Sequence, residues 1–327
     1  MRIGIMGAGS IGCYVGGRLV HAGHDVVFVG RQALGDEIAE HGLTLSSFDE
    51  TLEVGPVVWS ADSTVLADAD LVLVAVKGLA TASVAAELAP ILSPECVVLS
   101  LQNGVRNAEQ LRDTLGPRRV WPCMVPFNVL RMGQGRFHQG TSGELTTAAD
   151  LPPAIVEAFA GAGLPFHEAP DIEAVLWGKL VINLNNALNA LADLPLKQQL
   201  EDPVWRKVMS RAIAEGLAVF DAAGIRPKTF LPVPPWMVVH LLRLPTWLFT
   251  RVARKMVDVD PTARSSMWED LQKGRQTEVR LLNGEIVALG QTHGVPTPVN
   301  SRIVQAIEAA ERGERDPAAT EALRACA

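Results

Sequence analysis

The chain has 327 residues, of which 48% are hydrophobic and 20% are charged. This length accommodates two domains of ordinary size, and the apolar content excludes a disordered chain. The formal net charge of −7 argues against nucleic acid as a partner, although it permits a local basic pocket for a small anion.

The first half of the chain alternates apolar strands with helices. Residues 2–6 form the first expected strand, a helix follows and ends near Gly23, and HDVVFVGR is the second expected strand. Buried strands that alternate with helices are typical of a mostly parallel sheet. The later elements expected here are strands at 71–76, 96–101 and 119–125, helices at 80–91 and 106–115, a hairpin at 134–147, and a helix with a short strand within 152–167.

From about residue 171 the pattern becomes helical and strand candidates disappear. We therefore predict an α/β fold, in which an N-terminal Rossmann-type, doubly wound sheet is followed by an all-α C-terminal domain. The first domain is expected at residues 1–168 and the second at 169–327. Helices of the second domain are expected at 171–191, 202–223, 236–253, 264–273, 276–292 and 298–312.

The most apolar long segment, residues 232–256, contains Trp and Pro and is interrupted by Arg243 and Pro245. It falls short of a membrane span. Its composition favours a buried helix or a dimer interface over docking on a membrane surface. We therefore expect a homodimer and no membrane partner.

Four cysteines stand far apart in the sequence, at Cys13, Cys96, Cys123 and Cys326. They form no CxxC pair, and no histidine lies near them at metal-ligand spacing. We expect reduced thiols and no metal site, as in a cytoplasmic protein. The opening letters MRIGIMGAGS already make a strand and a loop, which leaves no room for a signal peptide.

A glycine pattern separates the first strand from the first helix. Gly7 permits a tight turn, Gly9 lets a pyrophosphate approach the backbone, and Gly12 lets the helix pack closely on the strand. The helix N-terminus then offers amide donors to the phosphates. The context therefore favours a dinucleotide-binding loop over an ordinary strand-to-helix turn. The loop consists of Gly7, Ala8, Gly9, Ser10, Ile11 and Gly12.

Three polar residues follow the ends of later strands. Arg31 stands where an NAD-preferring site usually has an acid, and a guanidinium can bind the 2′-phosphate of NADP(H). The alternative interpretation is that Arg31 is a solvated arginine in a loop, without a ligand. Lys77 and Asn103 stand at carboxyl ends of predicted parallel strands, which is the edge where open α/β sheets bind ligands. Asn103 can also belong to a simple Asn-Gly turn.

The stretch VLWGKLVINLNNALNAL is expected to be a helix, although it contains four asparagines. At about 100° per residue, Lys179, Asn183 and Asn186 fall within an arc of about 60° beside a broad apolar face. Amides there can bind a carboxylate, carbonyl or hydroxyl group, and a partly desolvated lysine can hold an anion or give up a proton. We therefore predict a ligand site rather than a solvated stripe. Asn185 and Asn189 lie on another arc, and we interpret them as structural.

Taken together, these features resemble the ketopantoate reductase (2-dehydropantoate 2-reductase) family. The resemblance runs from Met1 to about Arg312 and rests on the motifs GAGSIG, AVKGLA, QNG, LWGKLVIN and SSMWEDLQKGRQTEVRLLNG. It implies reduction of the ketone of 2-dehydropantoate, a small-molecule 2-keto acid, to the alcohol of pantoate on the way to coenzyme A. The implied cofactor is NADP(H).

The resemblance implies cofactor contacts in the first domain. The family's glycine loop matches residues 7–12, its 2′-phosphate arginine matches Arg31, and its strand-end lysine matches Lys77. Its cofactor and substrate asparagine matches Asn103. A backbone contact to the cofactor falls near Asn128.

The resemblance also implies roles in catalysis and substrate binding. The catalytic lysine matches Lys179, which would stabilise charge on the ketone oxygen and donate the proton. Asn183 and Asn103 would orient the carbonyl and hydroxyl groups. Ser266 would hold the substrate carboxylate, and Glu278 would organise Lys179 or the cofactor ribose. Without the resemblance, Ser266 would be a helix N-cap and Glu278 an acid on a helix surface.

Some positions depart from the family pattern. Ala187 stands where the family has its second helix asparagine, with Asn186 beside it as a substitute, and Lys197 stands near the place of an Asn-Gly pair that contacts substrate. These changes make a related bulky 2-keto acid an alternative substrate. Two further alternatives stay open: a β-hydroxyacid or 6-phosphogluconate type dehydrogenase, and a non-catalytic NADP(H) sensor on the same fold.

Overall fold

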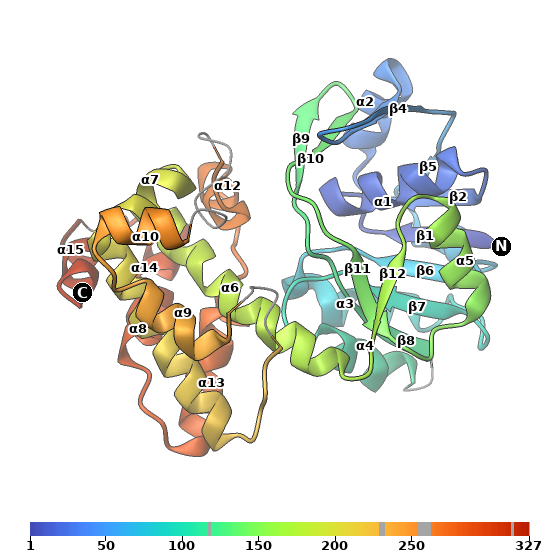
Figure 1. Cartoon of the computed structure of the whole chain (residues 1–327). Coiled ribbons are helices and arrows are strands. Elements are labelled where there is room, and N and C mark those ends of the chain that lie inside the picture. The colour runs from blue at the N-terminus through green and yellow to red at the C-terminus, as the bar shows by residue number, and fades with distance from the viewer. Residues whose placement is uncertain (117–118, 229–232, 254–262, 315–316, 327) are drawn as a thin grey trace. The chain divides into compact units, whose positions relative to one another are not determined.

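The polypeptide divides after Ile172 into two units, Met1–Ile172 and Glu173–Ala327. The first unit is α/β, and the described part of the second is helical (Figure 1), so the predicted fold class is confirmed. The roles expected for the two halves, NADP binding and substrate binding, stay predictions. The computed structural model describes residues 1–116, 119–228, 233–253, 263–314 and 317–326.

An eight-stranded sheet forms the centre of the first unit, in the order β12-β11-β8-β7-β6-β1-β2-β5. The strands from β8 to β5 run parallel, whereas β11 is antiparallel to β8. The carboxyl ends of β1, β2, β6 and β7 therefore meet at one edge. The strand bounds are β1 Arg2–Met6, β2 Asp25–Val29, β5 Val58–Ser60, β6 Leu71–Val74, β7 Val97–Ser100, β8 Val120–Met124, β11 Leu145–Ala148 and β12 Phe166–Ala169.

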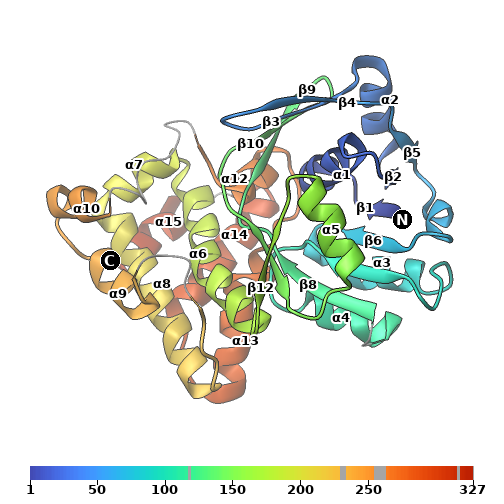
Figure 2. The ribbon, with the colours of Figure 1, turned by 45° about the vertical axis from the view of Figure 1, so that its right-hand side comes forward.

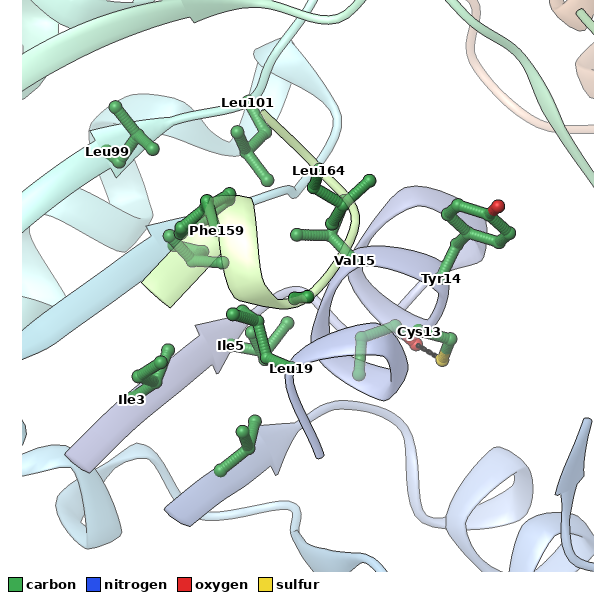
Figure 3. Packing of buried hydrophobic residues seen from close by; sticks show 14 of the residues in the cluster. Ile3, Ile5, Cys13, Tyr14, Val15, Leu19, Leu99, Leu101, Phe159 and Leu164 are labelled. Atoms are coloured by element: carbon green, nitrogen blue, oxygen red, sulfur yellow. Dashed lines mark hydrogen bonds between the residues drawn. The ribbon is translucent and has the colours of Figure 1, made fainter. Parts of the chain in front are cut away.

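Both faces of this sheet are covered by helices, so its strands are apolar on both sides. In β6, Leu71 and Leu73 pack into the core shared with α1 and α5, whereas Val72 and Val74 pack into the core shared with α3 and α4. Figure 2 shows these two pairs of helices on opposite sides of the sheet. Figure 3 shows Ile3 and Ile5 of β1 meeting Val15 and Leu19 of α1 in the first of these cores. The helix bounds are α1 Ser10–His21, α2 Gln32–His41, α3 Thr81–Leu88, α4 Asn107–Leu115 and α5 Pro153–Gly161, with 3₁₀ turns η1 Ser63–Leu66 and η2 Gly78–Ala80.

The hairpin predicted at residues 134–147 is wrong, because the two halves of that segment belong to different sheets. The chain reverses between β9 and β10 at Gln134 and Gly135, whose φ angles are 52° and 67°. Two successive positive φ values are typical of the type I′ turns that join hairpin strands. β10 continues a small four-stranded sheet, β4-β3-β10-β9, whereas β11 joins the large one. The small sheet consists of β3 Leu43–Ser46, β4 Thr51–Val54, β9 Val129–Gly133 and β10 Arg136–Gln139.

The helix predicted at residues 236–253 is two short helices, α9 (Pro235–Leu241) and α10 (Thr246–Val252). Pro245 has no N–H to continue a helix, and it disfavours the helical conformation at the preceding residue. The helix therefore ends before Pro245 and restarts after it. The remainder of the predicted segment 232–256 lies partly outside the described residues.

The helix predicted at residues 276–292 begins later than expected. A 3₁₀ turn, η4 (Val279–Leu281), precedes α13, which starts only at Asn283. The other expected helices of the second unit are present within a few residues of their predicted ends. The helix bounds are α6 Ile172–Ala192, α7 Leu196–Glu201, α8 Pro203–Ala222, α12 Ser266–Gln272, α13 Asn283–His293, α14 Pro298–Glu311 and α15 Pro317–Arg324.

The described residues contain neither a candidate membrane span nor a candidate metal site. No helix in that part of the chain is long and apolar enough to cross a bilayer. In the same residues, no three side chains of His, Cys, Asp or Glu gather as metal ligands would. All four cysteines are buried and unpaired, and burial raises the pKa of the Cys13 thiol to about 12.

Candidate active site

The loop between β1 and α1 has the backbone geometry that its glycines predict. Gly7 has a φ of +98°, and a Cβ there would lie 2.6 Å from the backbone nitrogen of Val76. A Cβ on Gly12 would lie 2.5 Å from the carbonyl oxygen of Gly7. The amides of Gly7 and Ala8 both donate to the carbonyl of Val29, at 3.0 and 2.9 Å. The loop is therefore tied to the end of β2, and side chains at Gly7 and Gly12 would break its packing.

Gly9 is the N-cap of α1, and a Cβ there would meet no atom within 4 Å. Ser10 and Ile11 follow as the first residues of the helix. The first amides of a helix have no intrahelical acceptor, and the first turn of α1 contains no acid. Open space, amide donors and a positive dipole end thus coincide, and the loop fits the pyrophosphate of a dinucleotide.

Arg31 lies beside this loop. It is the exposed N-cap residue of α2, and the Gly30 that precedes it approaches the loop so closely that a Cβ would lie 2.9 Å from the Cβ of Ala8. No acid follows the end of β2 until Asp36, whose carboxylate accepts a hydrogen bond from Gln32 at 2.8 Å. The site therefore presents a guanidinium next to the phosphate loop, where a 2′-phosphate would need one.

A buried polar network holds the two loops that follow β6 and β7. The amide of Gln102 donates to the hydroxyl of Thr81 at 2.7 Å and to the carbonyl of Val76 at 3.2 Å. Thr81 also contacts the amide oxygen of Asn107 at 2.8 Å, and Asn107 in turn donates to the carbonyl of Asn103. Gln102 of the QNG motif is therefore a structural residue that joins the loops.

Lys77 and Asn103 occupy those two loops. Lys77 is exposed and is the N-cap of η2, and Asn103 is half-buried before Gly104, which has a φ of +98°. Because β6 and β7 are adjacent parallel strands, the structure brings Lys77 and Asn103 to the same sheet edge. Asn128 stands elsewhere, before β9, where its side-chain oxygen accepts from the hydroxyl of Thr141 at 3.0 Å.

In the second unit, α6 carries Lys179, Asn183 and Asn186. Lys179 is half-buried, and burial lowers the pKa of its ammonium group to about 8. Asn183 is only 7% exposed. Its side-chain amide makes no hydrogen bond to another described residue and is not among the polar atoms fully shut off from solvent without a partner, so it stays available to a ligand. A shifted lysine and a partnerless amide one turn apart are the properties of a binding face.

Gly178, immediately before Lys179, is required by close packing. The backbone amide of Lys228 donates to the carbonyl of Ala174 at 2.8 Å, and this contact brings the Lys228 carbonyl onto α6. A Cβ on Gly178 would lie 1.6 Å from that carbonyl oxygen. The LWGK motif therefore uses glycine so that a second chain segment can pack beside the lysine.

We expect Gly178→Ala to lower the free energy of unfolding by about 1–3 kcal/mol, because the added methyl forces the Lys228 backbone away from α6. Urea unfolding followed by circular dichroism measures the change. Gly161→Ala is the matched control, since a Cβ there meets nothing within 4 Å and the φ of Gly161 suits alanine. Equal stabilities of the two variants would contradict the packing argument.

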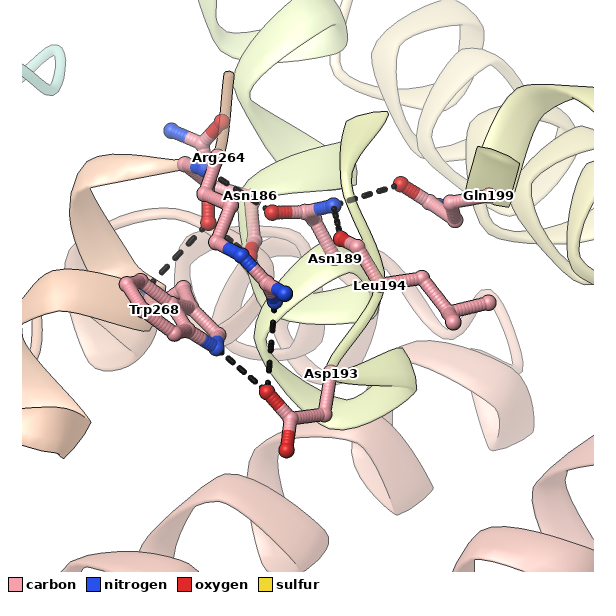
Figure 4. Close-up of polar contacts among 8 residues, drawn as sticks. Asn186, Asn189, Asp193, Leu194, Gln199, Arg264 and Trp268 are labelled. Atoms are coloured by element: carbon pink, nitrogen blue, oxygen red, sulfur yellow. Dashed lines mark hydrogen bonds and ion pairs between the residues drawn. The ribbon is translucent and has the colours of Figure 1, made fainter. Parts of the chain in front are cut away.

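The other two asparagines of α6 are structural, which confirms their interpretation. The amide of Gln199 donates to Asn185 at 2.7 Å. Asn189 donates to Gln199 at 3.1 Å and to the carbonyl of Leu194 at 2.9 Å (Figure 4). Their amides thus satisfy one another and fasten α7 to α6. Sequence periodicity separated them from the Lys179 face but did not identify Gln199 as their partner.

Ser265, rather than Ser266, caps α12. The Ser265 side chain accepts from the amide of Trp268 at 3.2 Å and donates to the carbonyl of Asn186 at 2.9 Å. Its backbone amide donates to the side chain of Asn189 at 2.8 Å. The N-cap interpretation of Ser266 is therefore wrong: Ser266 is the exposed first residue of the helix, held beside the Asn186 turn of α6.

Glu278 is 5% exposed and precedes η4, so its interpretation as an acid on a helix surface is wrong. The turn is fixed on one side by Thr277, whose amide donates to Glu311 at 2.8 Å. On the other side, the side chain of Asn283 donates to the carbonyl of Leu184 at 3.5 Å. The turn that contains Glu278 is thus attached to α6 at Leu184, the residue after Asn183.

Each unit therefore gathers part of the predicted set. The first contains the glycine loop with Arg31, and Lys77 with Asn103. The second contains Lys179 with Asn183 on α6, and Ser266 beside Asn186. The roles in cofactor and substrate binding that the resemblance implies for these residues stay predictions.

Comparison with protein-family models matches residues 3–150 to "Ketopantoate reductase PanE/ApbA" and residues 171–311 to "Ketopantoate reductase PanE/ApbA C terminal". A 2-dehydropantoate 2-reductase of Archaeoglobus fulgidus is 30% identical over 95% of this chain and 98% of its own length. The 2-dehydropantoate 2-reductase of Halobacterium salinarum is 29% identical over 95% of this chain and 99% of its own length. The crystal structure of a PanE/ApbA family ketopantoate reductase from Ralstonia eutropha is similar with a TM-score of 0.83 and 32% identity, covering 97% of this chain and 100% of that one.

Proposed function

The chain belongs to the ketopantoate reductase family and is an NADP-dependent oxidoreductase, and from this we propose that it reduces the ketone of 2-dehydropantoate to the alcohol of pantoate. The observation that carries the proposal is the face of α6, where an ammonium with a pKa of about 8 lies one turn from a buried amide that has no partner among the described residues. This face suits a ligand that accepts both a proton and a hydrogen bond.

The first unit would hold the cofactor. The amides that follow Gly9 would bind the pyrophosphate, Arg31 would bind the 2′-phosphate, and the loops of Lys77 and Asn103 would line the same sheet edge. When bound, NADPH supplies the hydride that is added to the ketone carbon. The residues of the chain bind and orient the reactants and supply the proton.

Lys179 is the proposed proton donor. As hydride reaches the ketone carbon, negative charge develops on the ketone oxygen, and an ammonium placed there stabilises the charge and gives up its proton. Burial supports this role, because it lowers the pKa of Lys179 from 10.5 to about 8. The proton is then held weakly enough to be donated, while most of the population is still charged at neutral pH.

The remaining side chains would position the substrate. Asn183 and Asn103 would bind its oxygen atoms by hydrogen bonds, with Asn186 in place of the family's second helix asparagine. Ser266 would hold the carboxylate. Glu278 would organise Lys179 or the cofactor ribose, and its burial supports a role beyond surface charge.

Arg31→Ala is expected to weaken NADPH binding roughly 10- to 100-fold and to leave NADH binding within about threefold, because one charge-assisted pair to the 2′-phosphate is lost. Fluorescence titration of the two reduced cofactors measures both affinities without any substrate. Arg136→Ala removes an exposed arginine from the same unit and serves as the control. Equal weakening of NADPH and NADH would exclude a 2′-phosphate contact at Arg31.

A substrate panel tests the proposed reaction. NADPH oxidation is followed with 2-dehydropantoate, 2-ketoisovalerate and phenylglyoxylate, and NADP⁺ reduction with 3-hydroxyisobutyrate and 6-phosphogluconate. We expect the highest kcat/KM for 2-dehydropantoate. A higher kcat/KM for another 2-keto acid would identify that compound as the substrate instead. Ala187 leaves this alternative open, because its small side chain replaces the family's second helix asparagine. NADPH binding with no turnover of any compound would favour a sensor.

The partner that we propose is a second copy of this chain, in a cytoplasmic enzyme whose other ligands are small molecules. The apolar outer residues of α9 and α10 support a homodimer, because such faces commonly mark subunit contacts. Trp236 is 57% exposed and Trp247 is 72% exposed.

A further inference from the structure

Trp59 of β5 packs against the backbone on both sides of Arg31. β5 is the neighbour of β2, and Trp59 pairs with Phe28 of that strand. Two glycines flank Arg31: Gly30 precedes it, and Gly35 is the fourth residue of α2. A Cβ on Gly30 would lie 2.8 Å from Cζ2 of Trp59, and a Cβ on Gly35 would lie 2.4 Å from its Cδ1. The indole ring therefore spans the two backbone positions between which Arg31 begins the helix.

A second aromatic ring packs against the face of this indole. The rings of Phe28 and Trp59 are stacked, with centroids 5.9 Å apart and an interplanar angle of 9°. Phe28 in turn packs on α1, where a Cβ on Gly16 would lie 2.5 Å from its ring. Close-packed rings have little freedom to shift. The start of α2 is therefore set against α1, the helix that follows the glycine loop.

The middle of α2 is fixed independently of Trp59. The carboxylate of Glu37 accepts a hydrogen bond from the backbone amide of Gly135 at 2.9 Å and forms an ion pair with Arg131. Both partners belong to the hairpin that β9 and β10 form. A change in the packing at Trp59 would therefore shift the first turn of α2 more than the rest of the helix. Arg31 is the residue at which that turn begins.

The indole N–H of Trp59 indicates that the ring is used for its shape. Its Nε1 atom is shut off from solvent and has no hydrogen-bond partner among the described residues. A buried donor without an acceptor is unfavourable. By contrast, Nε1 of Trp121, in β8 of the same sheet, donates to Asp150 at 2.9 Å. Trp59 therefore contributes packing against the two glycines rather than a hydrogen bond.

We propose that Trp59 is a positioning residue for recognition of the 2′-phosphate of NADP(H), and that it acts by holding the backbone at Gly30 and Arg31 where the Arg31 guanidinium meets the phosphate. This inference rests on the role of Arg31 in the proposed function. A charge-assisted, paired hydrogen bond depends on geometry, and a shift of the supporting backbone by about 1 Å loses much of it. NADH has no 2′-phosphate, so its affinity should not depend on Trp59 in this way.

The first test measures the dissociation constants of NADPH and NADH by fluorescence titration of the full chain. Trp59→Leu leaves a gap against the Arg31 backbone, and Gly35→Ala forces a methyl group against the indole. Each variant is expected to weaken NADPH binding about 5- to 20-fold and to leave NADH binding within about threefold. The ratio of the two constants is the readout, because a general loss of folded protein would weaken both cofactors alike.

Trp121→Leu is the matched control for this test. It removes another half-buried tryptophan from the same sheet, in a strand that β7, β6, β1 and β2 separate from β5. The ratio of the NADPH and NADH dissociation constants is expected to stay at its wild-type value. Equal weakening of NADPH and NADH by Trp59→Leu and Gly35→Ala would overturn the inference.

The second test determines whether Trp59 acts through Arg31. In an Arg31→Ala background the 2′-phosphate contact is already lost, so adding Trp59→Leu is expected to change NADPH affinity by less than about twofold. Equal losses of NADPH affinity in the wild-type and Arg31→Ala backgrounds would overturn the inference. If Arg31→Ala weakens NADPH selectively and Trp59→Leu does not, the inference alone is wrong. If Arg31→Ala weakens both cofactors equally, the proposed 2′-phosphate contact is wrong as well.

Discussion

Lys179→Ala is expected to lower kcat for 2-dehydropantoate reduction by roughly 10²- to 10⁴-fold, the usual contribution of a positioned general acid. The loss falls mainly on turnover, because the ammonium acts on charge that exists only as the hydride is transferred. Steady-state NADPH oxidation at saturating cofactor measures kcat and KM separately. NADPH affinity, measured by fluorescence without substrate, is expected to stay within about threefold.

Lys207→Ala is the matched control for this prediction. Lys207 lies on α8 of the same unit and is exposed, so its replacement removes the same charge without touching the α6 face. It is expected to leave kcat unchanged. A Lys179→Ala enzyme with near-normal kcat would remove Lys179 from the reaction, whatever its effect on KM.

Arg206→Met is expected to lower the free energy of unfolding by about 3–5 kcal/mol, because several buried carbonyls lose their donor together and each buried acceptor left unsatisfied costs about 1–3 kcal/mol. The methionine keeps apolar bulk against Phe249 but leaves backbone carbonyls without donors. Arg206 of α8 is 1% exposed and donates to the carbonyls of Leu200 and Glu201, at 2.8 and 3.0 Å. It also donates to the carbonyls of Leu242 and Leu244, at 3.3 and 2.9 Å, in the segment between α9 and α10 that we call the α9–α10 corner. The second unit would lose the link between α7, α8 and the corner.

Guanidinium unfolding of the variant measures this change. Arg211→Met is the control, because Arg211 is exposed on the same helix and its replacement is expected to cost less than about 0.5 kcal/mol. A loss below about 1 kcal/mol for Arg206→Met would show that the corner is held by apolar packing alone.

Patterns local in sequence predicted the first unit of the fold well. Gly7 and Gly12 stand where a side chain would collide with the backbone. The spacing of the glycines was therefore enough to predict the shape of the loop between β1 and α1. The strands of the large sheet are apolar on both faces, which favours a parallel sheet between helices. The periodicity of α6 likewise separated Lys179 and Asn183 from Asn185 and Asn189 correctly.

Features that depend on distant contacts escaped prediction. The sequence gives no reason to choose Ser265 over Ser266 as the cap of α12, because the choice depends on Asn186 and Asn189, which lie far away in the chain. Arg206 in the middle of an amphipathic helix resembles a surface residue until the α9–α10 corner is placed against it. Glu278 is buried for the same kind of reason.

Roles in catalysis are a separate matter from position. The fold brings Lys179 and Asn183 to one face, and the family supplies the chemistry that such a face performs. Ser266, Glu278 and Asn128 owe their proposed roles to the resemblance alone. Burial now adds an independent argument for Glu278, and exposure leaves Ser266 accessible to a ligand.

The pH dependence of kcat for NADPH-dependent reduction of 2-dehydropantoate tests most directly the claim that the Lys179 ammonium protonates the ketone oxygen. Because the donor must carry its proton, and its pKa is lowered to about 8, kcat should be constant below that pH and fall about tenfold per pH unit above it. The residual kcat of Lys179→Ala should not show this decrease above about pH 8. Proton donation by Lys179 would be contradicted by a wild-type kcat that stays level to about pH 10. It would also be contradicted by a decrease in kcat above about pH 8 that persists in Lys179→Ala.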